Sequence, residues 1–220
     1  MKYVINPDVI KARAGIYKDT AENRSKHRVG LRYGSQNIEK FYEQSVKRIS
    51  DLKDILESHK NENTDYILAP PKRMERIKEK IETDYSGDFR KIKDIIRSTI
   101  ICKNVEECKK VYNKLNKEHK IIKAFFDFQS KTYQGANIVI NLKGVPAEIQ
   151  INTPVNIALK ENIDHPALKS TFEILKQSGI KPGMGHKYYE IWRKNTPDSP
   201  TALQVNQHMV RYYGQRELFK

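Results

Sequence analysis

Residues 136–152 alternate between apolar and polar side chains, which is the pattern of a half-buried β-strand. The segment reads ANIVINLKGVPAEIQIN, and the Lys-Gly pair at its centre is typical of a two-residue hairpin turn. Because successive side chains of a strand point to opposite faces, Glu148, Gln150 and Asn152 share one face and the isoleucines between them share the other. The pattern predicts a β-hairpin with one apolar core face and one polar face.

The hairpin register can be predicted from the turn. With a turn at 143–144, Val139 lies opposite Glu148 and Asn137 lies opposite Gln150, and partners across strands share a face. The polar face then gathers five side chains: Asn137, Asn141, Glu148, Gln150 and Asn152. It contains amides and a carboxylate but no lysine, although lysine and arginine together number 41 in this chain. We interpret this face as the floor of a site, with a solvated sheet face as the alternative.

Periodic patterns continue across the rest of the chain. Apolar residues recur at helical spacing from about 36 to 60, and a second helix is expected from Lys72 to about Thr83. β-Branched runs predict strands at 97–103 and 121–130, with a helix capped by Asn104 between them. Further helices are expected at about 154–162, 165–178, 184–194 and 198–214. This order predicts an α+β fold in which a mixed, mostly antiparallel β-sheet is flanked by helices.

The charge balance narrows the classes of partner. Lys and Arg number 41 against 27 Asp and Glu, which gives a net charge of +14 over 220 residues. Such a charge favours nucleic acid, nucleotides or another polyanion, although a lysine-rich solvated surface gives the same number. No apolar run reaches the roughly 20 residues of a membrane span, and the N-terminal residues lack a signal-peptide pattern. Cys102 and Cys108 lack the spacing of a metal site or a disulfide framework, so we expect a reduced, cytoplasmic protein, with an exported toxin as the alternative.

A basic segment, PPKRMERIKEK, begins the second predicted helix. Lys72, Arg76 and Lys80 are spaced i, i+4 and i+8, which places three cations on one side of a helix. Lys and Arg bind phosphate oxygens through charge-assisted hydrogen bonds, so this side suits a polyphosphate. The alternative is a solvated helix whose glutamates neutralise the cations.

Two further segments carry candidate chemistry. Asp94 stands where an apolar strand opens, so it either caps a turn or holds Mg²⁺ together with Glu148, since two carboxylates can share a metal that is also bound to phosphates. Arg97, three residues later, can hold a phosphoryl group in the transition state. In GMGHKYYEIWR, His186 and Tyr189 lie one turn apart on a predicted helix, where a lone histidine is more often structural.

These features, in this order, resemble the synthetase domain of the RelA/SpoT family. Enzymes of that family have a nucleotidyltransferase-like fold and transfer the β,γ-diphosphate of ATP to a 3′-hydroxyl. The segment EIQINT is similar to the family's E-x-Q-x-x-T strand, and HKYY is similar to its H-x-x-Y motif. The resemblance implies ATP or phosphate binding by five residues: Lys72, Arg76, Lys80, Arg97 and His186. It implies that Asp94 and Glu148 are catalytic and bind the metal, with Mg²⁺ as the cofactor.

One segment departs from the family pattern. Members that make guanosine tetraphosphate show G-Y-x-S-x-H before the glutamate strand, and the tyrosine stacks on guanine. Here the segment reads GANIVINL, so Asn137 replaces the tyrosine and Asn141 the histidine. An amide cannot supply stacking worth roughly 1–3 kcal/mol per base, which argues against a guanine nucleotide as the acceptor. The acceptor-binding residues are then Asn137, Asn141, Gln150 and Tyr189, with Tyr133 as a substitute stacking residue, and the basicity favours tRNA or other RNA over GDP.

The resemblance covers about residues 65–195. We therefore expect a basic arm and a long helix at 1–64, a synthetase core at 65–195 and a C-terminal helix at 196–220. The chain resembles a stand-alone small synthetase or a toxin-like relative. The expected partners are ATP, an acceptor that is either a nucleotide or tRNA, and an antitoxin protein. No interaction with a membrane is expected. One other interpretation is a nucleic-acid-binding or regulatory protein that has this fold but altered catalysis. Another is a nucleotidyltransferase, because nucleotidyl transfer also uses paired acidic residues on a sheet.

Overall fold

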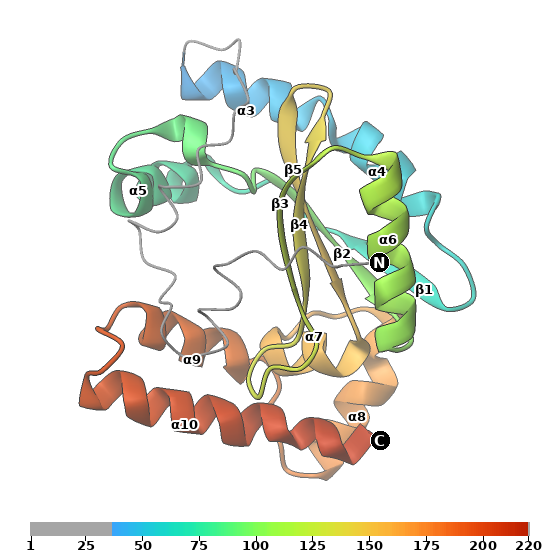
Figure 1. The fold of residues 1–220 in the computed structure, drawn as a ribbon, viewed down its shortest axis with the longest axis vertical. Helices are drawn as coiled ribbons and strands as arrows, with labels where there is room; N and C mark the ends of the chain where they lie inside the picture. The colour runs from blue at the N-terminus through green and yellow to red at the C-terminus, as the bar shows by residue number, and fades with distance from the viewer. Residues whose placement is uncertain (1–36, 220) are drawn as a thin grey trace.

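The computed structural model describes residues 37–219, and the expected basic arm lies outside the described residues. Figure 1 shows a sheet flanked by helices, which confirms the predicted α+β class. The strands are β1 (Thr64–Leu68), β2 (Ile96–Cys102), β3 (Ile121–Asp127), β4 (Gly135–Leu142) and β5 (Val145–Asn152). The helices are α3 (Ile38–Val46), α4 (Ile49–Glu57), α5 (Met74–Tyr85), α6 (Val105–Glu118), α7 (Pro154–Lys160), α8 (Lys169–Gln177), α9 (Met184–Arg193) and α10 (Pro200–Gly214). Short 3₁₀ turns are η1 (Phe89–Lys91), η2 (Pro166–Leu168) and η3 (Gln215–Phe219).

The strand order across the sheet is β1-β2-β5-β4-β3. β2 and β5 run parallel, whereas the β1–β2, β4–β5 and β3–β4 pairs are antiparallel. The sheet is therefore mixed and mostly antiparallel, as predicted. A parallel pair needs a long crossover, which α6, β3 and β4 supply here, and the crossover places β5 at the centre of the sheet.

The hairpin of β4 and β5 has the predicted register. Val139 pairs with Glu148, and Asn137 pairs with Gln150. Lys143 (φ 50°) and the following glycine (φ 95°) both adopt positive φ, as a two-residue hairpin turn of this kind requires. The predicted division of faces follows from this register, because the isoleucines of both strands are buried in the core.

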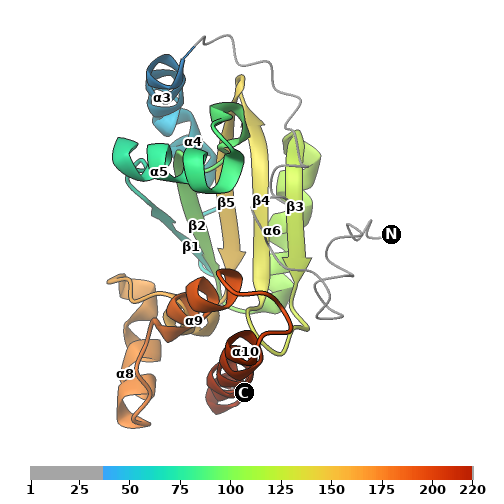
Figure 2. The same cartoon turned by 90° about the vertical axis from the view of Figure 1, so that its left-hand side faces the viewer.

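The two faces of the sheet are covered differently. Helices α4 and α6 lie along one face, and α3 crosses its upper end in Figure 1. Phe41, Leu52 and Leu115 from these helices are fully buried against the strands. Figure 2 looks onto the other face, where α5 crosses one end of the strands and α9 the other, and the middle of the strands lies between them.

A second apolar cluster joins the C-terminal helices. Its buried members include Leu159 of α7, Leu175 of α8 and Tyr213 of α10. Beyond α10, Arg216 donates to the backbone carbonyls of Ser130 (3.1 Å) and Thr132 (2.6 Å), which fastens this end of the chain to the loop after β3. No helix within residues 37–219 combines the length and the apolar character that a bilayer span demands.

Three elements differ from the sequence-based prediction. The helix expected at 36–60 is divided into α3 and α4, and Ser45 Oγ donates to the Phe41 carbonyl at 2.8 Å just before the break, a back-bond that bends helices. Helix α5 begins at Met74, so Lys72 lies before the helix and not in it. Strand β1 was not predicted, because its five residues look like a break between two helices until they pair with β2 at the sheet edge.

Candidate active site

The polar face of the sheet can be followed strand by strand, because cross-strand partners share a face. One line of partners, which we call the carboxylate row, consists of Lys123, Val139, Glu148 and Arg97. The neighbouring line, which we call the amide row, consists of Phe125, Asn137, Gln150 and Thr99. The rows are two residues apart along each strand, which is about 7 Å. The register therefore sets a carboxylate and a guanidinium beside a strip of amides.

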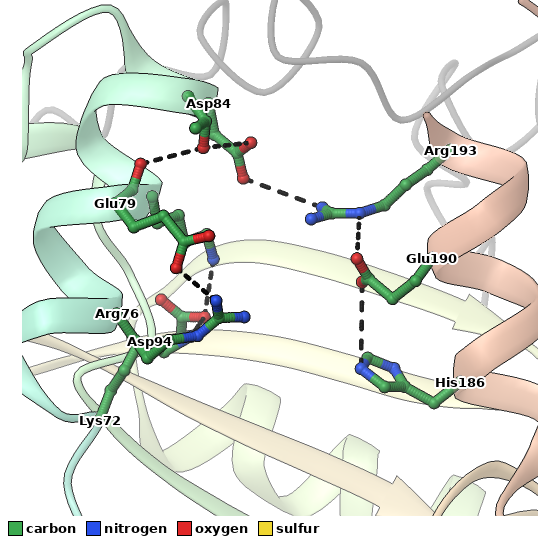
Figure 3. Close-up of polar contacts among 10 residues, drawn as sticks. Lys72, Arg76, Glu79, Asp84, Asp94, His186, Glu190 and Arg193 are labelled. Atoms are coloured by element: carbon green, nitrogen blue, oxygen red, sulfur yellow. Dashed lines mark hydrogen bonds and ion pairs between the residues drawn. The ribbon is translucent and has the colours of Figure 1, made fainter. Parts of the chain in front are cut away.

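Asp94, just before β2, is held by two lysines. Its Oδ2 accepts hydrogen bonds from Lys72 Nζ at 2.7 Å and from Lys80 Nζ at 2.8 Å (Figure 3). The Asp94 side chain is 15% exposed. Burial alone would raise the pKa of Asp94, but the charges of Lys80 and Lys72 outweigh burial and hold that pKa below its ordinary value. Two cations therefore share one carboxylate, which leaves a positive charge for an anionic ligand.

The two lysines experience different surroundings. Burial lowers the pKa of Lys72, in spite of its contact with Asp94. Burial alone would also lower the pKa of Lys80. The negative charge of Asp94, with smaller contributions from Tyr85 and Glu148, outweighs burial and raises that pKa above its ordinary value. Lys80 thus interacts with both predicted catalytic carboxylates, and with Asp94 at hydrogen-bond distance.

Glu148 and Arg97 are cross-strand neighbours on the parallel strands β5 and β2. Glu148 Oε1 accepts a hydrogen bond from Asn137 Nδ2 at 2.5 Å. Arg97 Nε is buried and has no hydrogen-bond partner within residues 37–219. An unsatisfied buried donor costs about 1–3 kcal/mol, which an anionic ligand can recover. The carboxylate row therefore places a hydrogen-bond-accepting carboxylate beside a cationic side chain with an unsatisfied donor.

An ion-pair chain connects α5 with α9 across this face of the sheet (Figure 3). Arg193 Nη1 lies 3.8 Å from Asp84 Oδ2 on α5, and Arg193 Nε donates to Glu190 Oε2 at 2.8 Å. His186 Nε2 lies 3.9 Å from Glu190 Oε1. His186 therefore belongs to the α9 side of the site, and Asp94 with its lysines to the α5 side.

Gln150 is linked to α7 through the half-buried Lys160. Its Oε1 accepts from Lys160 Nζ at 2.7 Å, and the same ammonium pairs with Glu161 at 2.8 Å. Burial alone would lower the pKa of Lys160, but Tyr133 and Glu161 outweigh it and raise that pKa. Tyr133 is itself engaged, because its hydroxyl accepts from Asn152 Nδ2 at 2.9 Å and its ring lies 5.4 Å from the Lys160 ammonium.

Three of the predicted site residues make other contacts. Arg76 is exposed and forms an ion pair with Glu79 instead of joining Asp94. Asn141 Oδ1 accepts from the backbone N–H of the hairpin glycine at 2.9 Å, at the far end of β4 from Asn137. The Tyr189 ring stacks on Trp192, with ring centroids 6.1 Å apart. The structure thus brings together Lys72, Lys80, Asp94, Arg97, Asn137, Glu148 and Gln150.

Sequence reasoning missed Lys160, Glu161 and Asp84, and it placed Arg193 one turn beyond Tyr189 without assigning it a role. Lys160 is one lysine among many, and nothing local distinguishes it from a solvated side chain. The Asp84–Arg193 pair joins distant parts of the chain, so no spacing rule reveals it. Phe125 was also overlooked, although the β3–β4 pairing would have placed it beside Asn137.

The donor set suits a hard divalent cation. Within residues 37–219, no three His, Cys, Asp or Glu side chains are arranged as a metal cluster. Mg²⁺ does not require one, since it binds through one or two carboxylates together with substrate phosphates and water. Asp94 Oδ1 is buried and has no hydrogen-bond partner within the described residues, so it remains available for a ligand. Asp94 and Glu148 therefore fit Mg²⁺ in the presence of a polyphosphate.

Comparison with known proteins gives consistent matches. Residues 69–168 match the family described as "Region found in RelA / SpoT proteins". A "(p)ppApp synthetase toxin Tas1" from Pseudomonas aeruginosa (strain UCBPP-PA14) is 36% identical over 150 residues, which are 66% of this chain but 34% of Tas1. This chain thus spans about a third of the length of that relative. A chain in the crystal structure of the complex between the Type VI effector Tas1 and its immunity protein is similar with a TM-score of 0.67 and 33% identity, over 80% of this chain and 94% of that chain.

Proposed function

Because this chain belongs to the RelA/SpoT family, we propose that it is an ATP-dependent diphosphotransferase, which moves the β,γ-diphosphate of ATP to the 3′-hydroxyl of an acceptor nucleotide. The observation that carries the proposal is the convergence of Lys72, Lys80 and Asp94 at the end of the sheet where Arg97 lies beside Glu148. Phosphoryl-type transfer depends mainly on positioning and charge neutralisation, and this cluster offers both.

Each residue has a role that its contacts support. Lys72 and Lys80 carry two positive charges against the one negative charge of Asp94, so an ATP polyphosphate can bind the excess. The unsatisfied Nε of Arg97 can donate to a phosphoryl oxygen as charge develops there. Glu148, oriented by Asn137, would accept the proton of the attacking 3′-hydroxyl. The new bond joins the 3′-oxygen to the β-phosphorus, and the bond between the α,β-bridging oxygen and the β-phosphorus breaks, which releases AMP.

Asp94 and Glu148 would hold Mg²⁺ together with the phosphates of ATP. When bound, the ion neutralises charge on the transferring diphosphate. Arg76 and His186 extend the proposed ATP-binding surface along α5 and α9, and Tyr189 and Asn141 are proposed on the acceptor side, as the family resemblance implies.

We propose adenine nucleotides as the acceptors, because the relative that shares 36% identity is named a (p)ppApp synthetase toxin. The solved complex of Tas1 with an immunity protein supports a second proposal, that an inhibitory protein partner exists for this chain.

The decisive experiment follows label from ATP. Purified protein is incubated with Mg²⁺ and ATP labelled at the α-, β- or γ-phosphorus, with AMP, ADP, GDP, GTP or tRNA as the acceptor. We expect the β and γ labels to move together to an adenine nucleotide and the α label to remain in AMP. Transfer of the γ label alone would indicate a kinase, and incorporation of the α label would indicate a nucleotidyltransferase. Either result would contradict the proposal.

A matched pair of variants tests the site itself. Glu148→Gln removes the proposed base and should abolish transfer while ATP still binds. Glu106→Gln makes the same change on α6, which lies along the opposite face of the sheet, and should leave transfer unchanged, since the Glu106 side chain is 71% exposed there. Full activity in Glu148→Gln would show that the reaction uses another group.

The net charge of +14 favours RNA as a second candidate acceptor. In that case label would move to tRNA, and binding would weaken with salt by a log–log slope of about −0.7 per phosphate contact. A flat salt response together with rapid use of ADP would exclude RNA as the acceptor. Tight RNA binding without any label transfer would instead favour a regulatory protein.

A further inference from the structure

Phe125 lies at the β3 end of the amide row. It pairs across the strands with Asn137, which pairs in turn with Gln150. Its side chain is half-buried on the polar face of the sheet, whereas the ring of its neighbour Phe126 packs on Tyr112 at 4.9 Å between centroids. An aromatic side chain therefore stands in a row that otherwise consists of polar groups.

A second ring holds Phe125 in place. The Tyr133 ring lies nearly parallel to it, with an angle of 21° and 6.5 Å between centroids. Tyr133 is fixed by its hydrogen bond with Asn152 and by the Lys160 ammonium over its ring. A ring that is already oriented loses less conformational freedom when a ligand binds to it.

Hydrogen-bond partners determine which atoms the two amides keep for a ligand. A lysine ammonium only donates, so the Gln150 atom that contacts Lys160 at 2.7 Å is the oxygen, and Gln150 Nε2 remains as a donor. A carboxylate accepts, so Asn137 presents Nδ2 to Glu148 at 2.5 Å and keeps Oδ1 as an acceptor. One donor and one acceptor thus lie side by side in the amide row.

We propose that the amide row binds the base of the acceptor nucleotide, with Phe125 stacking on the base and Asn137 and Gln150 reading its edge. This inference rests on the proposed function, in which the acceptor hydroxyl reaches Glu148 in the adjacent row, about 7 Å away along the strands. Phe125 would then supply, from another strand, the aromatic surface that Asn137 cannot offer. The free acceptor, Asn137 Oδ1, can pair with the N6 amino group of adenine, and the free donor, Gln150 Nε2, can pair with adenine N7. Guanine presents two acceptors, O6 and N7, at the same edge, so one of them would face Asn137 Oδ1 without a hydrogen bond.

Equilibrium binding tests the inference without turnover. The ATP site is first saturated with α,β-methylene ATP, and binding of the unreactive acceptor analogue 3′-deoxy-ADP is then measured by calorimetry. Phe125→Leu should weaken binding by about 5- to 150-fold, which is the range expected for the loss of one base–aromatic stack. Phe125→Trp should retain affinity. Phe126→Leu is the matched control, because it makes the same change on the opposite face of the same strand and should leave the dissociation constant unchanged.

The selectivity of the row is tested with the guanine analogue. The wild-type protein should bind 3′-deoxy-ADP more tightly than 3′-deoxy-GDP. Lys160→Met frees the Gln150 amide to turn and should narrow this preference, which a general loss of stability would not do. Equal dissociation constants for wild type and Phe125→Leu would overturn the inference alone. Absence of label transfer by the wild-type protein would overturn the proposed function, while the binding comparison would still report on the row.

Discussion

The substitution Asp94→Asn removes the one negative charge that two lysines share. The asparagine keeps the shape of the side chain, but the ammonium groups at 2.7 and 2.8 Å then face a neutral amide. Removing one partner from a buried ion pair costs about 3–5 kcal/mol. The Asp94 side chain is 15% exposed and therefore not fully desolvated, so we expect a loss near the lower end of this range, about 3 kcal/mol.

Urea and thermal unfolding followed by circular dichroism measure this loss. At about 2–4 °C per kcal/mol for a chain of this size, the melting temperature of Asp94→Asn should fall by about 6–12 °C. Glu79→Gln is the control, because its ion pair with Arg76 has side chains that are 55% and 71% exposed and should contribute less than about 1 kcal/mol. Inorganic pyrophosphate should raise the melting temperature of Asp94→Asn, since it supplies negative charge to the lysines.

The pH dependence adds a second readout. The folded-state pKa of Asp94 lies below its unfolded value of about 3.9, so its stabilising contribution is complete above that unfolded pKa and is lost as the pH falls toward the folded one. The difference in unfolding free energy between wild type and Asp94→Asn should therefore be constant near pH 7 and shrink below about pH 4. Equal stability of the two proteins at pH 7 would refute the reasoning, because it would mean that water already screens the cluster.

Two further substitutions test the framework of the site. Gly135→Ala would place a Cβ 2.6 Å from Asn152 Nδ2 and 2.8 Å from Tyr133 Oη, at a φ of +156°. Thermal unfolding should therefore show that the free energy of unfolding falls by about 2 kcal/mol. No fall would mean that these two side chains move aside. Lys143→Asn puts a residue that tolerates positive φ at the hairpin turn, where lysine has φ 50°. Because the ion pair between Asp51 and the 61% exposed Lys143 adds little, the variant should be as stable as the wild type or up to about 1 kcal/mol more stable. A marked loss of stability in Lys143→Asn would show that this exposed ion pair matters more than the turn geometry.

The parts of the fold that the sequence predicted well depend on local patterns. The register of Asn137 and Glu148 followed from alternation with period two and from the turn residues, and both are properties of adjacent residues. The helix after β2 was predicted from its spacing and from Asn104, whose side chain accepts from the Glu107 backbone N–H at 2.9 Å. The mixed sheet was predicted from the order of elements.

The parts that were missed depend on contacts between distant residues. Arg76 and Lys80 look equivalent on a helix, yet only Lys80 reaches Asp94, because the position of α5 against the strand decides the contact. Lys160 acquires its place beside Gln150 only when α7 folds back onto the sheet. Strand β1 is recognisable as a strand only through its partner. In each case tertiary packing, and not local propensity, selects one residue among similar ones.

The position of β5 has a consequence for the order in which the molecule forms. It is the last strand of the sheet to leave the ribosome, but its place is at the centre, between β2 and β4. Until it inserts, both neighbours present unpaired edges, which are prone to pair with other chains. The parallel pairing that brings Arg97 beside Glu148 also requires closure of a long loop, which makes it a slow contact to form. A nascent chain that ends before β5 therefore lacks both the assembled carboxylate row and a protected sheet, so assembly of the site and protection from aggregation arise in one folding step.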